Sequence, residues 1–194
     1  MKLKKLLIGI AAIALTFQIQ LAHAAGNPKV KMETTKGTIV LELYPDKAPT
    51  TVANFLSYVN AGAYDGTIFH RVIKGFMNQG GGFTVDYKKV ETKTPIKNEA
   101  DNGLKNLNFT IAMARTNAPH SATNQFFINT SDNYSLDHTS KSTRGWGYTV
   151  FGKVIEGENI VGAISRVRTG PGGPFSSDAP RTPIIIKKMT EIKE

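Results

Sequence analysis

The most informative part of the sequence is Phe69-His70-Arg71-Val72-Ile73-Lys74-Gly75-Phe76-Met77-Asn78-Gln79-Gly80-Gly81. Its apolar and polar residues do not alternate regularly, which by itself predicts a twisted strand that ends in a glycine turn. An arginine inside a phenylalanine-rich run also suggests the wall of a pocket with a charged donor in it. The glycines at 80–82 favour a bulge or a close crossing of strands, because no Gly-Lys-Ser/Thr sequence follows to complete a phosphate loop.

A second run places two aromatic residues side by side. It reads Ser121-Ala122-Thr123-Asn124-Gln125-Phe126-Phe127-Ile128. Neighbouring residues of a strand point to opposite faces of the sheet. We therefore expect one of the two phenylalanines to enter the core and the other to line a groove.

The segments before and after these runs have the periods of strands and helices. Residues 30–44 alternate between apolar and polar on either side of Lys36-Gly37, which predicts a β-hairpin. Residues 49–62 predict a helix, because proline opens the segment and the apolar residues recur at helical spacing. Residues 159–167 predict a second helix by the same criterion.

Short strand-like runs fill much of the remaining chain. They lie at 68–72, 108–113, 125–129, 148–154 and 184–189, with long loops rich in Gly, Asn, Thr and Lys between them. The glycine-proline segment 170–174 is predicted to be a loop within the domain, because a strand pattern resumes soon after it. Many strands, two helices and no βαβ alternation predict a closed antiparallel β-barrel whose ends the helices cover.

Composition and charge describe one globular domain with a basic surface. The chain has 194 residues, 40% hydrophobic and 20% charged, which is enough for one core and too few for two. The formal charge is +9 at pH 7, but the lysines are scattered and no arginine–aromatic stripe occurs. We therefore expect a solvated basic surface and no nucleic-acid binding. The chain has no cysteine, which excludes thiol nucleophiles and thiolate metal sites.

The N-terminus has the three parts of a secretory signal peptide. They are the lysines Lys2, Lys4 and Lys5, an apolar run of 12 residues from Leu6 to Phe17, and the small residues of Ala22-His23-Ala24. A membrane anchor is the alternative, but a spanning helix needs about 20 apolar residues. We expect residues 1–24 to be cleaved off, which leaves residues 25–194 as the mature domain with its charge lowered from +9 to +6.

The common catalytic constellations do not occur in the sequence. Three histidines follow the signal segment, His70, His120 and His138, and no pair of them has the i, i+4 spacing of helical zinc ligands. No His-Glu-x-x-His motif and no Gly-x-Ser-x-Gly elbow is present. We therefore expect no metal site and no hydrolytic nucleophile.

Three blocks of the sequence together resemble the signature blocks of the cyclophilin family of peptidyl-prolyl cis–trans isomerases. They are Phe69–Ile73 with Gly75-Phe76-Met77 and Gln79-Gly80-Gly81, then Gln125–Ile128, then Val150–Val154. Their order and spacing match from Val30 to the last predicted strand. The exported bacterial branch is the most similar, on the evidence of Thr110–Arg115 and Leu136–His138.

The resemblance implies a mainly β domain, a closed eight-stranded antiparallel barrel capped by two α-helices. It implies Arg71, Gln79 and His70 as catalytic residues, and Phe76, Met77, Ala114, Phe127, Leu136 and Tyr148 as substrate-binding residues. Ser135 departs from the pattern, since relatives usually have a bulky aromatic there, and the insertion at 139–146 is longer than expected. We expect only weak binding of cyclosporin-like cyclic peptides, which depend on that aromatic, unless Trp146 covers the gap.

The implied reaction is rotation about X–Pro bonds in peptides and unfolded exported proteins. The barrier is about 18–20 kcal/mol because rotation breaks amide resonance, and no nucleophile, metal or cofactor is needed. The permanently charged guanidinium of Arg71 would donate to the prolyl nitrogen of the twisted amide, which favours the transition state over both planar states. The apolar groove residues would seat the ring, and Gln79 with the backbone near Ala114 would hold the carbonyls.

Two alternatives stay open from the sequence. In the first alternative, the groove belongs to a holdase that binds proline-containing segments and turns them over only incidentally. Arg71 and Gln79 favour an enzyme over this alternative, because binding alone does not need them. The second alternative is a surface interaction protein that uses the basic face. In each case we expect a monomer without a stable membrane anchor, in the periplasm or released into the medium.

Overall fold

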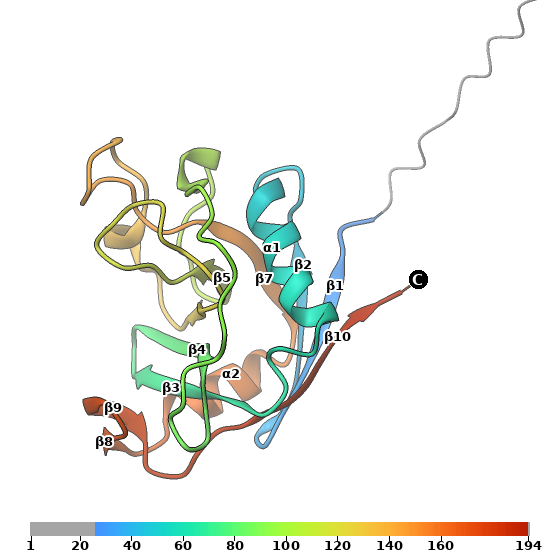
Figure 1. Cartoon of the computed structure of the whole chain (residues 1–194), viewed down its shortest axis with the longest axis vertical. Helices are drawn as coiled ribbons and strands as arrows, with labels where there is room; N and C mark the ends of the chain where they lie inside the picture. Colours follow the sequence, from blue (N-terminus) through green and yellow to red (C-terminus); the bar gives the residue numbers. More distant parts are fainter. Residues whose placement is uncertain (1–25, 194) are drawn as a thin grey trace, which may run out of the picture.

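One eight-stranded antiparallel sheet dominates the computed structural model, which describes residues 26–193 (Figure 1). Its strands are β1 (Lys29–Thr34), β2 (Gly37–Leu43), β3 (Thr67–Ile73), β4 (Met77–Thr84), β5 (Thr110–Met113), β6 (Phe126–Asn129), β7 (Val150–Glu156) and β10 (Ile186–Ile192). They lie in the order β10-β1-β2-β7-β5-β6-β4-β3. A separate hairpin is formed by β8 (Thr169–Gly172) and β9 (Phe175–Pro180).

The sheet is strongly curled but does not close into a barrel, so that part of the prediction is wrong. Its edge strands β3 and β10 meet through an isolated bridge between Ile68 and Ile185, and the Phe69 amide donates to the Ile184 carbonyl at 2.9 Å. A continuous ladder does not form there. Pro183, directly before Ile184, has no amide hydrogen to extend the pairing. The mainly β class, the eight strands and their antiparallel pairing are confirmed.

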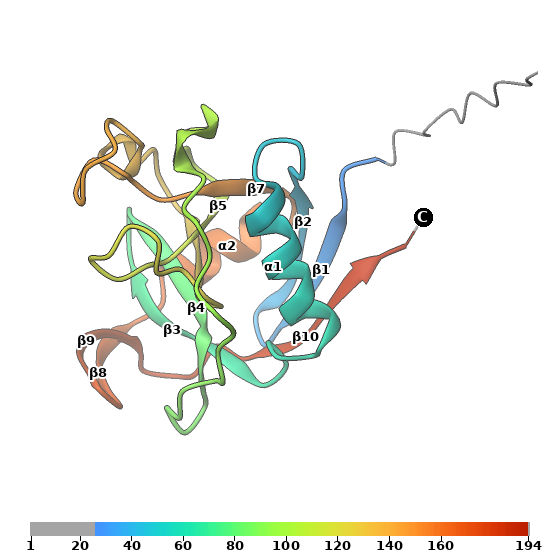
Figure 2. The same cartoon turned by 45° about the horizontal axis from the view of Figure 1, so that its top comes forward.

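Two helices pack against the curled sheet, as predicted from their apolar periods. They are α1 (Pro49–Asn60), which contacts β10, and α2 (Glu158–Ser165), which contacts β2 and β4 (Figure 2). The side chain of Asn78 fixes α2 on β4 by donating to the carbonyl of Val161 at 3.0 Å. None of the helices within residues 26–193 is long and apolar enough to span a membrane. The predicted signal segment 1–24 lies outside the described residues.

A carboxylate from a distant loop caps α1. The residue before the helix is Ala48, which offers no side-chain cap. Glu99 instead accepts hydrogen bonds from the amides of Thr50 and Thr51 at 3.1 and 2.8 Å, and from the Thr51 hydroxyl at 2.7 Å. A negative charge at a helix N-terminus is stabilising, because it satisfies free amides and complements the helix dipole. The loop that leads to β5 is thereby fixed to α1.

The core inside the curl is built around Phe126. Its ring makes edge-to-face contacts with Phe55 of α1, Tyr64 and Phe69, at centroid distances of 5.7, 5.5 and 6.1 Å. All four rings are fully buried. Gly81 allows this packing, because a Cβ atom there would meet the rings of both Tyr64 and Phe126. The predicted close approach of chains at the glycines is confirmed.

Two local predictions are corrected by the structure. The stretch 69–81 is not one twisted strand but the hairpin β3–β4, which turns at Gly75 with a φ of 71°. The segment 170–174 is not a simple loop, since most of it belongs to the hairpin β8–β9. The remaining predicted strands at 68–72, 108–113, 125–129, 148–154 and 184–189 correspond to β3, β5, β6, β7 and β10.

Candidate functional site

A β-bulge in β3 brings Arg71 to the site. Phe69 pairs with Gly80, but the next pair is Arg71 with Gln79, so two residues of β3 oppose one of β4. Regular alternation would place Arg71 on the same face as Phe69, which is buried in the core. The extra residue turns Arg71 to the outer face of the sheet, directly across from Gln79.

Arg71 and Gln79 line a cavity of about 140 Å³ on that face. The lining residues are Arg71, Phe76, Met77, Gln79, Ala114, Arg115, Phe127, Leu136 and Tyr148. The structure therefore brings together all six predicted substrate-binding residues and two of the three predicted catalytic ones. Met77 and Phe127 are almost fully buried and form its apolar floor. Phe126 points into the core and Phe127 into this groove, as the alternation predicted.

The guanidinium of Arg71 keeps its donors available. Its nearest carboxylate is Asp178 of β9, with 3.8 Å between Arg71 Nε and Asp178 Oδ2. Both side chains are about one-third exposed, at 38% and 35%, so this pair contributes little to stability. Within residues 26–193, Arg71 makes no side-chain hydrogen bond. A substrate in the groove would meet a permanent cation whose five N–H groups are free.

A hydrogen bond to a neighbouring strand orients Gln79. Its Nε2 donates to Oε1 of Gln125 at 3.0 Å, which leaves its own amide oxygen as a free acceptor. Gln79 and Gln125 also line an adjoining cavity of about 180 Å³, which shares Ala114 and Arg115 with the groove. The Ala114 amide is held by the Gln125 carbonyl at 2.9 Å, so the rim between the two cavities is fixed by the backbone.

Arg115 is a groove residue that the sequence analysis did not single out. Its guanidinium stacks over Tyr148, 4.7 Å from the ring centroid, and Nε donates to the Gly147 carbonyl at 2.9 Å. Another nitrogen reaches the Thr143 carbonyl at 3.3 Å, which ties the 139–146 insertion to the groove. A lone arginine before a loop carries no signal in the sequence, because only the fold brings these carbonyls around it.

Ser135 and Trp146 both lie outside the groove lining. Ser135 is exposed in a short 3₁₀ turn, Tyr134–Leu136. Trp146 is buried between His120 and His138, with ring centroids at 4.8 and 5.2 Å. The tryptophan therefore does not fill the space that an aromatic at 135 would occupy.

His70, the third predicted catalytic residue, is not brought into the groove. It is the extra residue of the bulge and is buried between Phe83 and Phe175, with ring centroids at 4.8 and 5.2 Å. Burial lowers the pKa of His70 to about 4, and the neighbouring Arg71 charge acts in the same direction. Its Nδ1 has no hydrogen-bond partner in the described part of the chain. The imidazole is neutral at pH 7.

No cluster of metal-binding side chains accompanies the groove. Among residues 26–193, no group of three or more His, Asp or Glu lies close enough together to hold a metal ion. The groove combines one free cation, one oriented amide and an apolar floor. Such a site can bind an apolar ring and stabilise developing charge beside it.

Comparisons with known proteins show which family the chain belongs to. The family described as cyclophilin type peptidyl-prolyl cis-trans isomerase/CLD matches residues 29–191. The peptidyl-prolyl cis-trans isomerase cyp18 of Streptomyces antibioticus is 59% identical over 158 residues, 81% of this chain and 95% of that protein. Peptidyl-prolyl cis-trans isomerase A of Dickeya dadantii is 49% identical and covers 95% of both chains.

A solved structure agrees with these matches. The cyclophilin type isomerase of Cryptosporidium parvum, crystallised in the presence of the dipeptide Ala-Pro, superposes with a TM-score of 0.69 at 27% identity. The match covers 86% of this chain and 99% of that one. The chain belongs to the cyclophilin-type peptidyl-prolyl cis–trans isomerases. Its activity is the isomerisation of X–Pro peptide bonds.

The buried neutral His70 predicts a specific acid sensitivity of folding. Its pKa is about 4 in the folded chain against an ordinary 6.5, so the unfolded chain binds more protons between these values. Its contribution is fully present above about pH 6.5 and is lost as the pH falls towards 4, by at most about 1.4 kcal/mol per pH unit. His70→Phe should flatten this part of the pH dependence, because phenylalanine cannot be protonated.

Urea unfolding of both proteins at a series of pH values between about 7 and 4 measures the difference. Carboxylates titrate equally in the two proteins, so they cancel in the comparison. Parallel stability curves would contradict the assignment of a neutral, buried His70.

Proposed function

We propose that this isomerase is exported and accelerates the folding of proteins outside the inner membrane, with Arg71 as the group that stabilises the twisted X–Pro bond. The observation that carries the mechanism is the placement of Arg71 across from Gln79, above the buried floor of Met77 and Phe127. The carved-out space is small and mostly apolar at its base. It suits the ring of a proline in an extended segment.

The prolyl ring is held by apolar contact and its neighbours by polar contact. Phe127 forms the floor, and Tyr148 packs edge-on against it at 5.7 Å between ring centroids. Phe76 and Leu136 close the sides of the groove. The free amide oxygen of Gln79 and the backbone near Ala114 flank the bound peptide where its carbonyl and amide groups pass. Ring and chain are then fixed on either side of one rotatable bond.

Arg71 acts on that bond electrostatically. In the planar amide the prolyl nitrogen shares its electron pair with the carbonyl and accepts no hydrogen bond. In the twisted state, which lies about 18–20 kcal/mol higher in water, the nitrogen regains the pair. A guanidinium N–H aimed at this nitrogen stabilises only the twisted state and lowers the barrier. An arginine cannot exchange a proton at neutral pH, so the step needs no acid or base.

His70 contributes as a positioning residue in this proposal, which changes the catalytic role expected from the resemblance. Its ring is buried among Phe83 and Phe175 and is neutral. Its side chain also interacts with Gln125, so it anchors the extra residue of the bulge next to the groove without lining it. Arg71, the next residue, is thereby kept facing the substrate.

The proposal of export rests on the N-terminal segment. Residues 1–24 combine a lysine-rich start, an apolar run too short to span a membrane, and small residues before Ala25. The substrates we propose are proline-containing stretches of newly exported, unfolded chains. The mature protein acts as a monomer, in the periplasm or in the medium.

Weak binding of cyclosporin-like cyclic peptides is a further part of this proposal. Ser135 is exposed beside Leu136, one of the groove residues, and presents no aromatic surface. Trp146 is held elsewhere by its two histidine neighbours. A large cyclic ligand would lose a stacking partner at this rim.

Processing gives the first test. Protein recovered from the cell envelope or the medium should have the intact mass of a chain that begins at Ala25. The physical reason is the small residue at each of the two positions that a signal peptidase reads. A recovered mass that still includes Met1 to Ala24 would refute export by cleavage.

The rim gives the second test. Ser135→Trp should tighten cyclosporin binding by roughly 0.5–1.5 kcal/mol beyond the added contact area, as aromatic pairs do, and change peptide turnover less. Ser135→Ala is the matched control and should leave the affinity unchanged. Titration calorimetry measures all three proteins. Equal affinity of the serine and tryptophan forms would exclude a role for this position.

Arg71 gives the third and decisive test. Arg71→Ala should lower kcat/KM for a short X–Pro peptide by about 10²–10³-fold, the effect of removing a transition-state donor. Affinity for the planar peptide should change little, because the donor acts in the twisted state. Arg71→Lys should recover part of the rate, since an ammonium lacks the guanidinium fork. A protease-coupled isomerisation assay gives the rates, and calorimetry gives the affinities.

Lys74→Ala is the control, since Lys74 is an exposed cation in the adjoining turn that does not line the groove. Melting temperatures show whether each variant is folded. A folded Arg71→Ala protein with near-normal turnover would show that Arg71 does not stabilise the twisted X–Pro bond. A wild-type protein that binds proline peptides without turnover would instead support the holdase alternative.

A further inference from the structure

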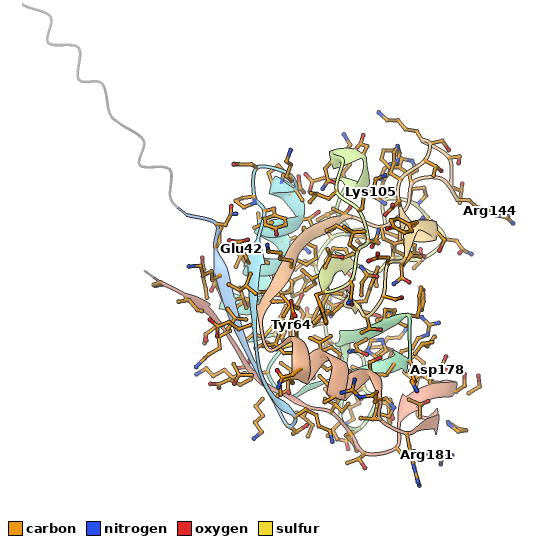
Figure 3. The ribbon with its side chains drawn as sticks, turned by 180° about the vertical axis from the view of Figure 1, so that it is seen from behind. Glu42, Tyr64, Lys105, Arg144, Asp178 and Arg181 are labelled. Atoms are coloured by element: carbon orange, nitrogen blue, oxygen red, sulfur yellow. The ribbon has the colours of Figure 1, made fainter. Side chains whose placement is uncertain are left out.

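A second cavity, of about 290 Å³, collects basic side chains from three segments. It is lined by Lys36 of the β1–β2 turn, by Val167 and Arg168 after α2, and by Arg181 and Thr182 after β9. It shares no lining residue with the groove of Arg71. In Figure 3, Arg181 projects from the end of the molecule opposite to Arg144.

The two arginines of this cavity face each other at the base of the hairpin β8–β9. Thr169 pairs with Pro180, and the Arg181 amide donates to the Arg168 carbonyl at 2.9 Å, one step further out. Like charges placed opposite each other on neighbouring strands are destabilising. An anion held between them would turn this repulsion into attraction.

No protein carboxylate supplies that anion. None lines the cavity, and within the described chain none of Lys36, Arg168 and Arg181 forms an ion pair. The C-terminus of α2 attracts cations through its dipole, and Arg166, directly after the helix, meets that need. A helix end does not account for cations from the β1–β2 turn and from the segment after β9.

All three cations are exposed, and contacts with neighbouring segments position two of them, Arg181 and Lys36. The guanidinium of Arg181 lies against Gly170 of β8, so a Cβ atom at residue 170 would overlap it and displace the arginine side chain. The turn that carries Lys36 is fastened to the segment before β10 by two hydrogen bonds. Thr35 N–H donates to the Ile185 carbonyl at 2.9 Å, and Ile185 N–H donates to the Thr35 hydroxyl oxygen at 3.1 Å.

We propose that this cavity binds a phosphate-bearing anion of the diphosphate class. Two guanidinium forks match phosphate oxygens in bidentate geometry, and the Lys36 ammonium and Thr182 hydroxyl add single donors. Several phosphate oxygens are needed to reach donors on three segments at once. Free oligophosphate and the phosphate headgroup of an anionic lipid share this chemistry.

Calorimetric titration of the purified protein with pyrophosphate tests the site. We expect saturable binding that weakens with added salt, because the contacts are ionic and partly exposed. Arg181→Ala should weaken it about tenfold, the loss of charge-assisted hydrogen bonds. Arg144→Ala removes an exposed arginine at the other end of the molecule and should have no effect. Isomerase activity should be normal in both variants.

Gly170→Ala separates geometry from charge. It keeps every cation but displaces the Arg181 guanidinium from its seat, so it should also weaken pyrophosphate binding. Sedimentation with phosphatidylglycerol vesicles, against phosphatidylcholine vesicles, distinguishes the sources. Vesicle binding that needs Arg181 indicates a lipid headgroup, and vesicle binding independent of Arg181 beside tight pyrophosphate binding indicates free oligophosphate. Failure of both probes to bind through Arg181, or an equal loss in Arg144→Ala, would overturn the proposal.

Discussion

The bulge in β3 is the constraint on which the groove depends. Three consecutive residues of one strand lie in three environments: Phe69 in the core, His70 against the β8–β9 hairpin and Arg71 in the groove. A regular strand has only two faces and would turn the arginine towards the core. An unpaired guanidinium there would cost several kcal/mol. The pairing of β3 with β4 is irregular at this point. As a result, the Arg71 guanidinium lies above the apolar floor of the groove and is not buried in the core.

The β8–β9 hairpin packs against the bulge. Phe175 stacks on His70, contacts Phe83 edge-on and reaches Tyr87, which joins the hairpin to the β3–β4 pair. Gly173 has a φ of 51° and lies against the Tyr87 side chain, which a larger residue there would displace. The same hairpin places Asp178 near Arg71 and, at its base, sets Arg168 opposite Arg181. One small two-stranded element therefore contacts both the bulge that carries Arg71 and the basic cavity.

The sequence predicted the features that depend on local period. Both helices, the first hairpin and the opposite directions of Phe126 and Phe127 follow from spacings of two or about four residues, and the structure has them. The sequence did not predict β4 as a separate strand, because its glycines have no side chains that could show the alternation of a strand. The sequence did not predict the β8–β9 hairpin for a different reason. The hairpin is anchored by the contact of Phe175 with His70, which is far away in the chain. The open seam between β3 and β10 depends on long-range pairing, which no local pattern encodes.

The two arginines of the groove show most clearly what only the fold decides. Arg115 donates hydrogen bonds to four backbone carbonyls, those of Gly147, Thr143, Thr116 and Asn117, and stacks on Tyr148. Its role is therefore to hold the rim of the groove in place. The nearest carboxylate to Arg71 is that of Asp178, 3.8 Å away, and the N–H donors of Arg71 remain free. The residue type, the charge and the near-permanent protonation are identical. The difference lies in which carbonyls surround the guanidinium, and a donor that is already satisfied has little to offer a transition state. The capacity to act on a substrate therefore depends on hydrogen-bond donors that the protein itself does not use, and in this groove those are the guanidinium N–H groups of Arg71.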